Sequence, residues 1–456
     1  MLERTVVIDI VGMSQRLIGE NTPFLKKRLS QKPYNHIKPL VPAVTCTIQS
    51  TYLTGKPPAD HGIVGNGWYS QDECEIKFWK QSNKLVQGPK IWDELRKIDP
   101  AFTCANMFWW YNMYSSVDYS VTPRPNYLAD GRKIPDAYSH PPQLRDQLQQ
   151  ELGQFPLFEF WGPRTTIRSS KWIADSSMIT EKKFKPTLSL VYLPHLDYCL
   201  QKYGQDVSRI KQDLLQIDAL VEDLVNFYEN RGVKVVLLSE YGITNVNRPV
   251  ALNRVLRTKG WLQIREERGL ELLDAGASKA FAVVDHQVAH VYVRDKENIA
   301  SVKALLEEQA GVAEVWGSEQ KELHRIDHSR SGDLMVIAEP ESWFTYYYWH
   351  DDKRAPDFAR TVEIHKKPGY DPVELFTDPE ISWLTARVGW KLLKKKLGFR
   401  VLMDIIPLDP TLIRGSHGVI PGDPLDWPII VADGLTPGDA LDATDVYGVL
   451  MDQLRT

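Results

Sequence analysis

The residues best suited to chemistry lie between Pro42 and Tyr69, where a hydroxyl-rich turn precedes a glycine-marked loop. β-Branched residues after Pro42 favour an extended backbone, and Thr47 to Leu53 lacks Gly and Pro and can form a helix. The free N–H groups at the start of such a helix favour an anion. Thr45 is therefore a candidate nucleophile, and the backbone N–H of Cys46 and the amide of Asn66 are candidates for holding a developing negative charge.

The same segment also has a purely structural interpretation. It could be a buried strand, a helix start and a loop whose glycines only satisfy turn geometry. A single Thr is usually structural, but here the hydroxyl, the helix start and the amide of Asn66 occur together. That combination favours a site for a phosphoryl group.

The segment resembles the nucleotide pyrophosphatase and type I phosphodiesterase branch of the alkaline phosphatase superfamily. In that family a Thr nucleophile precedes a TG…P…HGIVGN stretch, matched here by Thr54-Gly55, Pro58 and His61 to Asn66. The resemblance extends from the first strand to His417. It implies a metal-dependent hydrolase that cleaves a phosphoester, phosphodiester, pyrophosphate or phosphonate bond of a small molecule through a phospho-threonine intermediate.

The resemblance also implies two zinc ions, but several ligand positions are altered. The first-strand Asp-Gly falls on Val11-Gly12, although Asp9 lies two residues earlier on the same strand face. Gln201 stands where His would follow Asp197, and the Asp-His pair is replaced by Glu240-Tyr241. The residues expected to hold a metal are Asp9, Asp197, Gln201, Glu240, Tyr241 and His417.

This altered set is rich in oxygen, and Gln and Tyr are weaker zinc ligands than His. It would suit Mg²⁺ or Mn²⁺ better than a pair of zinc ions. The cofactor is therefore expected to be a divalent metal, Zn²⁺, Mn²⁺ or Mg²⁺, with a single ion or no ion left open.

Two further residues are candidates for binding an anionic substrate. Arg330 and His365 lie in polar loops marked by Gly and Pro, where they could bind substrate or support the loop. Lys366 and Lys367 are expected to be solvated. Asp285-His286 could be metal ligands, but a hairpin turn is favoured there.

The elements that must position these residues alternate between strands and helices. Short apolar runs are separated by helical patterns, which predicts an α/β fold with a mainly parallel sheet flanked by helices on both faces. In such sheets the chemistry lies beyond the carboxyl ends of the strands. The predicted strands are Thr5–Val11, Phe102–Phe108, Leu188–Leu193, Val233–Ser239 and Leu334–Ala338, and the predicted helices include Gln15–Leu29, Ser208–Arg231 and Ile381–Leu397.

The stretch from residue 246 to residue 315 has a different pattern. It contains a predicted helix over Val250–Lys259, a hairpin over Phe281–Val293 and a helix over Ala300–Gln309. It is predicted to be a small α+β cap inserted into an alkaline phosphatase-like core made of residues 1–245 and 316–456. The resemblance supports such a cap.

The composition limits which classes of binding partner are expected. The chain has 456 residues and a formal net charge of −4, so it has no broad basic surface for nucleic acid or an anionic membrane. No apolar stretch approaches the ~20 residues of a membrane helix, and the four cysteines show no metal-ribbon spacing. A cytoplasmic protein with a small phosphorylated substrate, and no nucleic-acid or membrane partner, is expected, while the oligomeric state is left open.

Two other functions compete with hydrolysis. The changes at Val11, Gln201 and Tyr241 also fit a catalytically weak or inactive relative that acts as a binding or pathway-assembly protein. A phosphoryl or nucleotidyl transferase would need only an organic acceptor in place of water. The retained Thr45 and Asn66 favour the enzyme.

Overall fold

The computed structural model describes residues 2–438 and 440–455, and within them the largest sheet has nine strands. Five central strands are parallel, and the edges are mixed. The order is β23 (Leu441–Asp442), β2 (Tyr34–Lys38), β22 (Ile429–Val431), β11 (Lys234–Leu238), β1 (Thr5–Ile10), β10 (Leu188–Leu193), β5 (Cys104–Met107), β6 (Tyr119–Pro123) and β9 (Ala137–His140).

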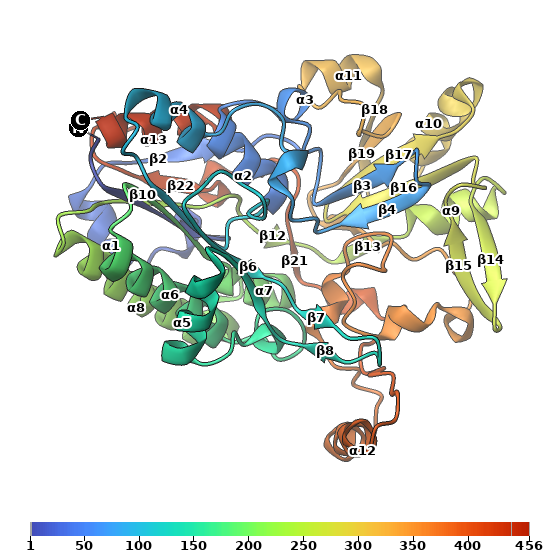
Figure 1. Ribbon diagram of the computed structural model, residues 1–456. Coiled ribbons are helices and arrows are strands. Elements are labelled where there is room, and N and C mark those ends of the chain that lie inside the picture. Colours follow the sequence, from blue (N-terminus) through green and yellow to red (C-terminus); the bar gives the residue numbers. More distant parts are fainter. Residues whose placement is uncertain (1, 439, 456) are drawn as a thin grey trace.

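Helices cover both faces of this sheet (Figure 1). One face carries α1 (Pro23–Gln31), α5 (Pro142–Leu152), α6 (Ile167–Phe184) and α8 (Val207–Glu229), and the other carries α2 (Thr45–Thr54), α4 (Ile91–Ile98) and α13 (Val446–Arg455). Every residue of β1 and β10 is buried, as expected for parallel strands between two helical layers. The predicted α/β fold is confirmed.

The predicted helix over Gln15–Leu29 is interrupted. A short 3-10 turn spans Gln15–Leu17, and α1 begins only at Pro23. Proline suits the first position of a helix because its missing N–H has no partner there. The apolar spacing continues on both sides of Pro23 and so hid this helix start, and the predicted helix therefore began too early.

A second, antiparallel sheet lies to the right in Figure 1. It consists of β16 (Ala280–Asp285), β17 (Val288–Val293), β19 (Leu334–Ala338) and β18 (Val312–Trp316), accompanied by α9 (Leu252–Thr258), α10 (Ile299–Glu307) and α11 (Ser318–Leu323). The predicted hairpin over Phe281–Val293 is confirmed by the pairing of β16 with β17.

One strand was assigned to the wrong sheet. Leu334–Ala338 was expected in the main sheet, but as β19 it pairs with β17 and β18. All five of its residues are buried, and a short apolar run looks the same in either sheet because its partners, not its own pattern, decide where it pairs. The cap bounds 246–315 stay a prediction, although the small sheet continues to Ala338.

Short two-stranded pairs accompany the nine-stranded and the four-stranded sheets. The two-stranded pairs are β3 (Gly67–Ser70) with β4 (Glu75–Phe78), β7 (Asn126–Tyr127) with β8 (Lys133–Ile134), β12 (Thr244–Asn245) with β21 (Gly415–Ser416), β13 (Arg248–Val250) with β20 (Ser342–Phe344), and β14 (Gln263–Glu267) with β15 (Leu270–Asp274). The remaining α-helices of the described chain are α3 (Pro58–His61), α7 (His195–Tyr203) and α12 (Leu384–Lys396). Among the described residues, no helix is both long and apolar enough to cross a membrane.

The parallel register brings the predicted site residues to one edge. Asp9 of β1 lies opposite Tyr192 of β10 and Leu238 of β11. Residues that follow β10 and β11 therefore meet beside the end of β1.

Candidate active site

Thr45 opens α2 at this carboxyl edge. Val44 has an extended backbone and Thr45 is the first helical residue, so the predicted strand-to-helix turn is present. The Thr45 hydroxyl lies 3.0 Å from the hydroxyl of Tyr241 and also interacts with the carboxylate of Glu240. The side chain is buried at 3% exposure, so the candidate nucleophile sits in a dry, polar environment.

Asn66 holds its loop against α2. Its Oδ1 accepts a hydrogen bond from the Cys46 N–H at 3.0 Å, while its own N–H and Nδ2 donate to the Asp285 carboxylate at 2.7 and 3.1 Å. Both groups predicted to hold negative charge are therefore bonded to protein partners. A phosphoryl oxygen would have to displace the Asn66 side-chain carbonyl before it could accept a hydrogen bond from the Cys46 N–H. The role of Cys46 and Asn66 in holding negative charge stays a prediction.

Asp9 and Glu240 form a buried carboxyl pair. Gln49 Nε2 donates to Glu240 and lies 3.5 Å from an oxygen of Asp9. Burial raises the pKa of Glu240 to about 7, and burial together with the Glu240 charge raises the pKa of Asp9 well above its usual range. Asp9 Oδ1 and Glu240 Oε2 have no hydrogen-bond partner among the described residues.

The other predicted ligands form a hydrogen-bonded chain. Gln201 Nε2 donates to Asp197 at 2.8 Å, Tyr241 donates to Asp197 at 3.3 Å, and the Tyr370 hydroxyl donates to Gln201 at 2.8 Å. His417 Nε2 lies 3.8 Å from Asp197 Oδ1, and its ring stacks on Tyr241 with centroids 3.7 Å apart. Burial raises the pKa of Asp197 to about 7.

All six predicted ligand residues thus lie at one edge, but they do not fit a two-zinc centre. The first-strand position is the buried apolar Val11, and the Gln201 amide points a donor at Asp197. Burial raises the pKa of Tyr241 well above its usual range, so its phenol is a hydrogen-bond donor rather than an anionic ligand. Within the described chain, no group of three or more His, Cys, Asp or Glu side chains is placed to hold a metal ion.

Sequence reasoning weighed His286 as a metal ligand but favoured a hairpin turn, and it missed Gln49 and Tyr370. His286 does occupy the predicted hairpin turn, with a φ of 63°, but its ring lies 3.7 Å from the ring centroids of both Tyr370 and His417. Its Nδ1 is 2.8 Å from Asp285 Oδ1, and Asp285 in turn holds Asn66. His286 therefore belongs both to the hairpin turn and to the site, two roles that were treated as alternatives in the sequence.

Gln49 carried a usable signal and Tyr370 did not. Gln49 follows Thr45 by four residues, so both project from one face of α2. Its Oε1 accepts from the Trp110 N–H at 2.7 Å. Tyr370 lies far along the chain, and nothing in its local pattern indicates that it reaches Gln201.

The two predicted substrate-binding residues contact other parts of the protein. Arg330 Nη1 donates to the carbonyls of Gly62 and Leu85 at 2.7 and 2.8 Å and lines a cavity of about 720 Å³ beside Trp68. His365 Nδ1 lies 3.4 Å from the Phe78 carbonyl. Their substrate-binding role stays a prediction.

The expectation of a solvated Lys367 is wrong. Its side chain is 1% exposed and forms ion pairs at 2.7 Å with both Asp371 and Glu374. A local run of charge indicates solvent exposure only on average, and here two nearby carboxylates compensate a buried ammonium. The pairs anchor the loop that carries Tyr370.

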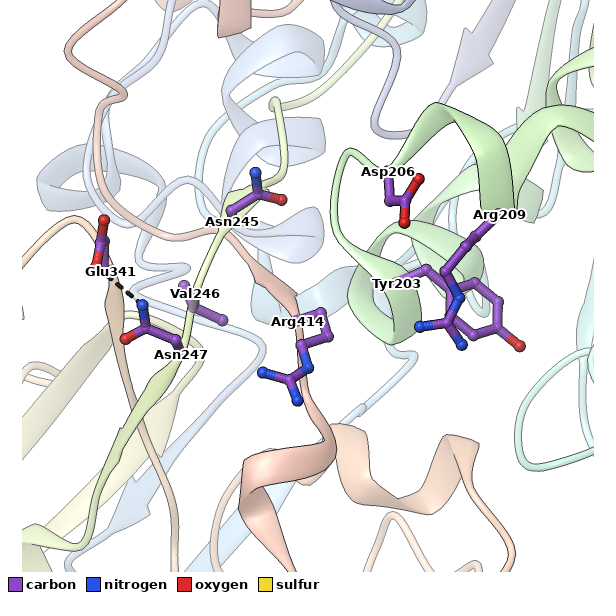
Figure 2. A pocket seen from close by; sticks show the side chains of 8 residues that line it. All are labelled: Tyr203, Asp206, Arg209, Asn245, Val246, Asn247, Glu341 and Arg414. Atoms are coloured by element: carbon purple, nitrogen blue, oxygen red, sulfur yellow. Dashed lines mark hydrogen bonds between the residues drawn. The ribbon is translucent and has the colours of Figure 1, made fainter.

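A second cavity, of about 360 Å³, lies near the far end of α7 (Figure 2). Arg209 lies beside Tyr203 in Figure 2, and its guanidinium is 4.2 Å from the ring centroid of Tyr203. The lining residues are Tyr203, Asp206, Arg209, Asn245, Val246, Asn247, Glu341 and Arg414. None of the predicted site residues lines this cavity.

Curated relatives share part of the chain. It is 22% identical over 267 residues to ectonucleotide pyrophosphatase/phosphodiesterase 2 of Saccharomyces cerevisiae, covering 53% of this chain and 48% of that protein. It is 22% identical over 271 residues to ectonucleotide pyrophosphatase/phosphodiesterase 1 of the same yeast, covering 54% and 34%. The chain spans about half, or less, of the length of these relatives.

Solved structures share the fold over nearly the whole chain. Phosphonoacetate hydrolase from Sinorhizobium meliloti 1021, in complex with phosphonoacetate, matches with a TM-score of 0.62 at 13% identity, covering 99% of this chain and 95% of that one. An inactive form of murine ectonucleotide pyrophosphatase/phosphodiesterase 5, in complex with AMP, matches with a TM-score of 0.60 at 13% identity and the same coverage. Both likenesses show an alkaline phosphatase-like fold.

The family follows from a match that includes the nucleophile loop, the altered ligand positions up to Tyr241 and the hairpin with Asp285. A model of the family described as type I phosphodiesterase / nucleotide pyrophosphatase matches residues 5–371. This chain therefore belongs to the type I phosphodiesterase / nucleotide pyrophosphatase family.

Proposed function

We propose that the protein hydrolyses a phosphoester, phosphodiester or pyrophosphate bond of a small molecule, with Thr45 as the nucleophile. The observation that carries the proposal is the position of the buried Thr45 hydroxyl at the start of α2, 3.0 Å from the Tyr241 hydroxyl. A free Thr hydroxyl is a poor nucleophile and needs a neighbouring group to take its proton. Membership of a family of phosphodiesterases and pyrophosphatases supports the reaction class.

The chemistry follows from these contacts. Thr45 Oγ1 attacks phosphorus, Glu240 accepts the hydroxyl proton, and the bond from phosphorus to the leaving oxygen breaks. Glu240, with a pKa of about 7, is partly ionised at neutral pH and can act as that acceptor. Water then attacks the phospho-threonine, the bond from phosphorus to Thr45 Oγ1 breaks, and Glu240 returns the proton to that oxygen. The N–H groups at the start of α2 stabilise the negative charge, with the Cys46 N–H exchanging the Asn66 carbonyl for a phosphoryl oxygen.

Aromatic rings beside the site suit an organic group on the phosphorus. Trp79 lies 5.0 Å from Trp110 and 6.1 Å from Tyr370, and Trp161 lies 5.7 Å from Tyr370, measured between ring centroids. Such rings stack well on a base or another flat leaving group. Because the murine structural relative binds AMP, nucleotides are the first substrates to test.

The metal dependence expected from the family is left to experiment. Zn²⁺, Mn²⁺ or Mg²⁺ would supply Lewis-acid stabilisation of the phosphoryl oxygens. The Asp197–Gln201–Tyr241 arrangement does not fit two zinc ions, so the steps above involve only side chains of this chain.

A second candidate function is supported by the same hydrogen bonds. Gln201 and Tyr241 use their polar groups to bind Asp197, and Tyr370 completes the network. A relative that keeps the phosphate pocket but has lost the metal ligands would bind a nucleotide without cleaving it.

One experiment separates the two. The purified protein is incubated with p-nitrophenyl phosphate, bis(p-nitrophenyl) phosphate and a dinucleotide, with each divalent ion or with EDTA, and AMP binding is measured by calorimetry. Turnover that is lost in the Thr45→Ala variant supports the hydrolase. AMP binding without turnover supports the binding protein. If the protein shows no turnover and does not bind AMP, both proposals are refuted.

A further inference from the structure

Helix α12 projects from the rest of the molecule, at the bottom of Figure 1. We define the α12 arm as residues 383–400, which comprise the helix and the residues at its two ends. No residue of α12 is buried. At the ends of the arm, Trp383 is 86% exposed and Phe399 is 64% exposed. The arm therefore leaves apolar side chains in water that a globular surface would normally cover.

These apolar side chains form a stripe. Trp390, Leu393 and Leu397 follow one another by three and four residues, so they share one face of the helix. Their exposed fractions are 57%, 46% and 66%. Single exposed apolar residues are ordinary, but a stripe of this kind marks a surface that binds a partner.

The arm is also strongly basic. It has six cations, and no Asp or Glu occurs between residues 383 and 403: the cations are Arg387, Lys391, Lys394, Lys395, Lys396 and Arg400. Arg387 and Lys391 pair with Asp404, which ties the inner side of the helix to the returning chain. In the described chain, the exposed side chains of Lys394, Lys395 and Lys396 have no carboxylate partner, and we call them the outward lysines. The Lys394 ammonium lies 5.2 Å from the ring centroid of Trp390, so these lysines lie beside the stripe.

We propose that the α12 arm binds the surface of an anionic lipid bilayer. Trp390, Leu393 and Leu397 would enter the headgroup region, while the outward lysines contact lipid phosphates. A helix whose lysines flank a stripe of Trp and Leu is typical of helices that lie in a membrane interface, because the ammonium groups reach the lipid phosphates while the stripe enters the headgroup region. This proposal does not depend on the proposed catalytic function.

Charge complementarity favours a lipid surface over a second copy of the arm. Two arms packed through their apolar stripes would bring together the lysines that flank each stripe, such as Lys394 beside Trp390, and like charges repel. An anionic bilayer compensates these charges and covers the stripe at the same time. The net charge of −4, from which no membrane partner was expected, is an average that conceals this local basic segment.

The test uses the full chain and sedimentation with vesicles of phosphatidylcholine alone or phosphatidylcholine mixed with phosphatidylglycerol. Binding is expected only to the anionic vesicles and is expected to weaken as salt is raised. K394Q/K395Q/K396Q should weaken binding roughly a hundredfold, because each basic residue near an anionic surface contributes about a fivefold gain in affinity.

Two further variants make the test specific. K26Q/K27Q/K211Q removes the same charge from exposed lysines on α1 and α8 and should bind like the wild type. Trp390→Ser/Leu397→Ser keeps the charge and should also lose binding, because the apolar stripe is removed. The two arm variants should keep the wild-type melting temperature, since α12 buries no side chain, and so should the control, whose three lysines are exposed.

Three results would overturn the proposal. The first is no binding of the wild type to either vesicle, and the second is equal, salt-independent binding to both. The third is a dimer that the Trp390→Ser/Leu397→Ser variant abolishes, because the stripe would then be an interface between copies of this chain. The salt titration uses only the wild-type protein, so the proposal can be tested even if a variant fails to fold.

Discussion

The two halves of the candidate site differ in how closely they match their family. The nucleophile half, around Thr45 and Asn66, matches in type and spacing. The ligand half, which includes Asp197 and the retained His417, has Gln201 and Tyr241 where two further His residues are expected, and both of these donate hydrogen bonds to Asp197. Changes at separate ligand positions have thus produced a connected polar network rather than isolated defects.

The difference has a physical basis. The nucleophile half takes its own residues from one short segment, so their type and spacing can be read locally, although Tyr241 and Asp285 hold them from far along the chain. The ligand half joins residues from three strand ends and a late loop, and a metal site fails when any one ligand has the wrong chemistry. Asp9 Oδ1, Glu240 Oε2 and His417 Nε2, which are among the buried atoms without a hydrogen-bond partner in the described residues, belong to the ligand half. A polar ligand would bind most readily there.

The largest expected effect is on the nucleophile half. Replacing Thr45 by Ala should lower kcat/KM by about a thousandfold or more, because the attacking oxygen is removed. The melting temperature should change little. Thr47→Ala is a matched control, since Thr47 is equally buried in α2 and its hydroxyl has no hydrogen-bond partner in the described chain. Wild-type turnover by Thr45→Ala would show that the nucleophile lies elsewhere.

Restoring the ligand half should change its metal content. The V11D/Q201H/E240D/Y241H variant should retain about two zinc ions per chain after dialysis, measured by mass spectrometry of the metals, because it regains the carboxylate and imidazole ligands of a two-metal site. The wild type should retain fewer, and Asp197→Ala or His417→Ala should lower whatever it holds. Two zinc ions in the wild type would contradict our view of the altered ligands.

The buried carboxyls of the ligand half should make stability depend on pH. Asp197 and Glu240 have pKa values of about 7 when folded, against roughly 4 when unfolded. Between these values the folded state binds more protons, so the free energy of unfolding should fall as pH rises from about 4 to 7.

Replacing one of these buried carboxyls by its amide should restore part of the free energy of unfolding that is lost as pH rises. At pH 8, Asp197→Asn or Glu240→Gln should raise the free energy of unfolding by about 1–3 kcal/mol, with little gain at pH 4. Urea unfolding at both pH values measures the effect, and the exposed Asp72→Asn is the control. An equal change at both pH values would rule out the ionisation of these groups as the cause.

The smallest effect should come from Tyr370. Tyr370→Phe removes the hydrogen bond to Gln201 and should lower the free energy of unfolding by about 1 kcal/mol. Tyr346→Phe is the matched control, because that buried hydroxyl has no partner among the described residues. If both variants are equally stable, the Tyr370 bond does not hold the ligand half together.

Much of the fold was predictable, because strands β1, β10 and β11 are apolar runs between helical patterns. The positions of Asp9, Asp197 and Glu240 at one edge followed from parallel strand order. The sheet that receives Leu334–Ala338 was not predictable, since hydrophobic pattern does not specify a pairing partner. Lys367 was misread for a similar reason, because its compensating carboxylates become neighbours only in the folded loop.

The sequence by itself determined the family, the alternation of strands and helices and the segment that carries Thr45, all of which depend on local patterns. Only the tertiary structure showed that Asn66 is held by Asp285, that His286 packs on His417 and that Tyr370 donates a hydrogen bond to Gln201. It also showed that Gln201 and Tyr241 direct hydrogen bonds to Asp197. These contacts join residues far apart in the chain, and their geometry depends on how the two sheets pack together, which no local pattern encodes.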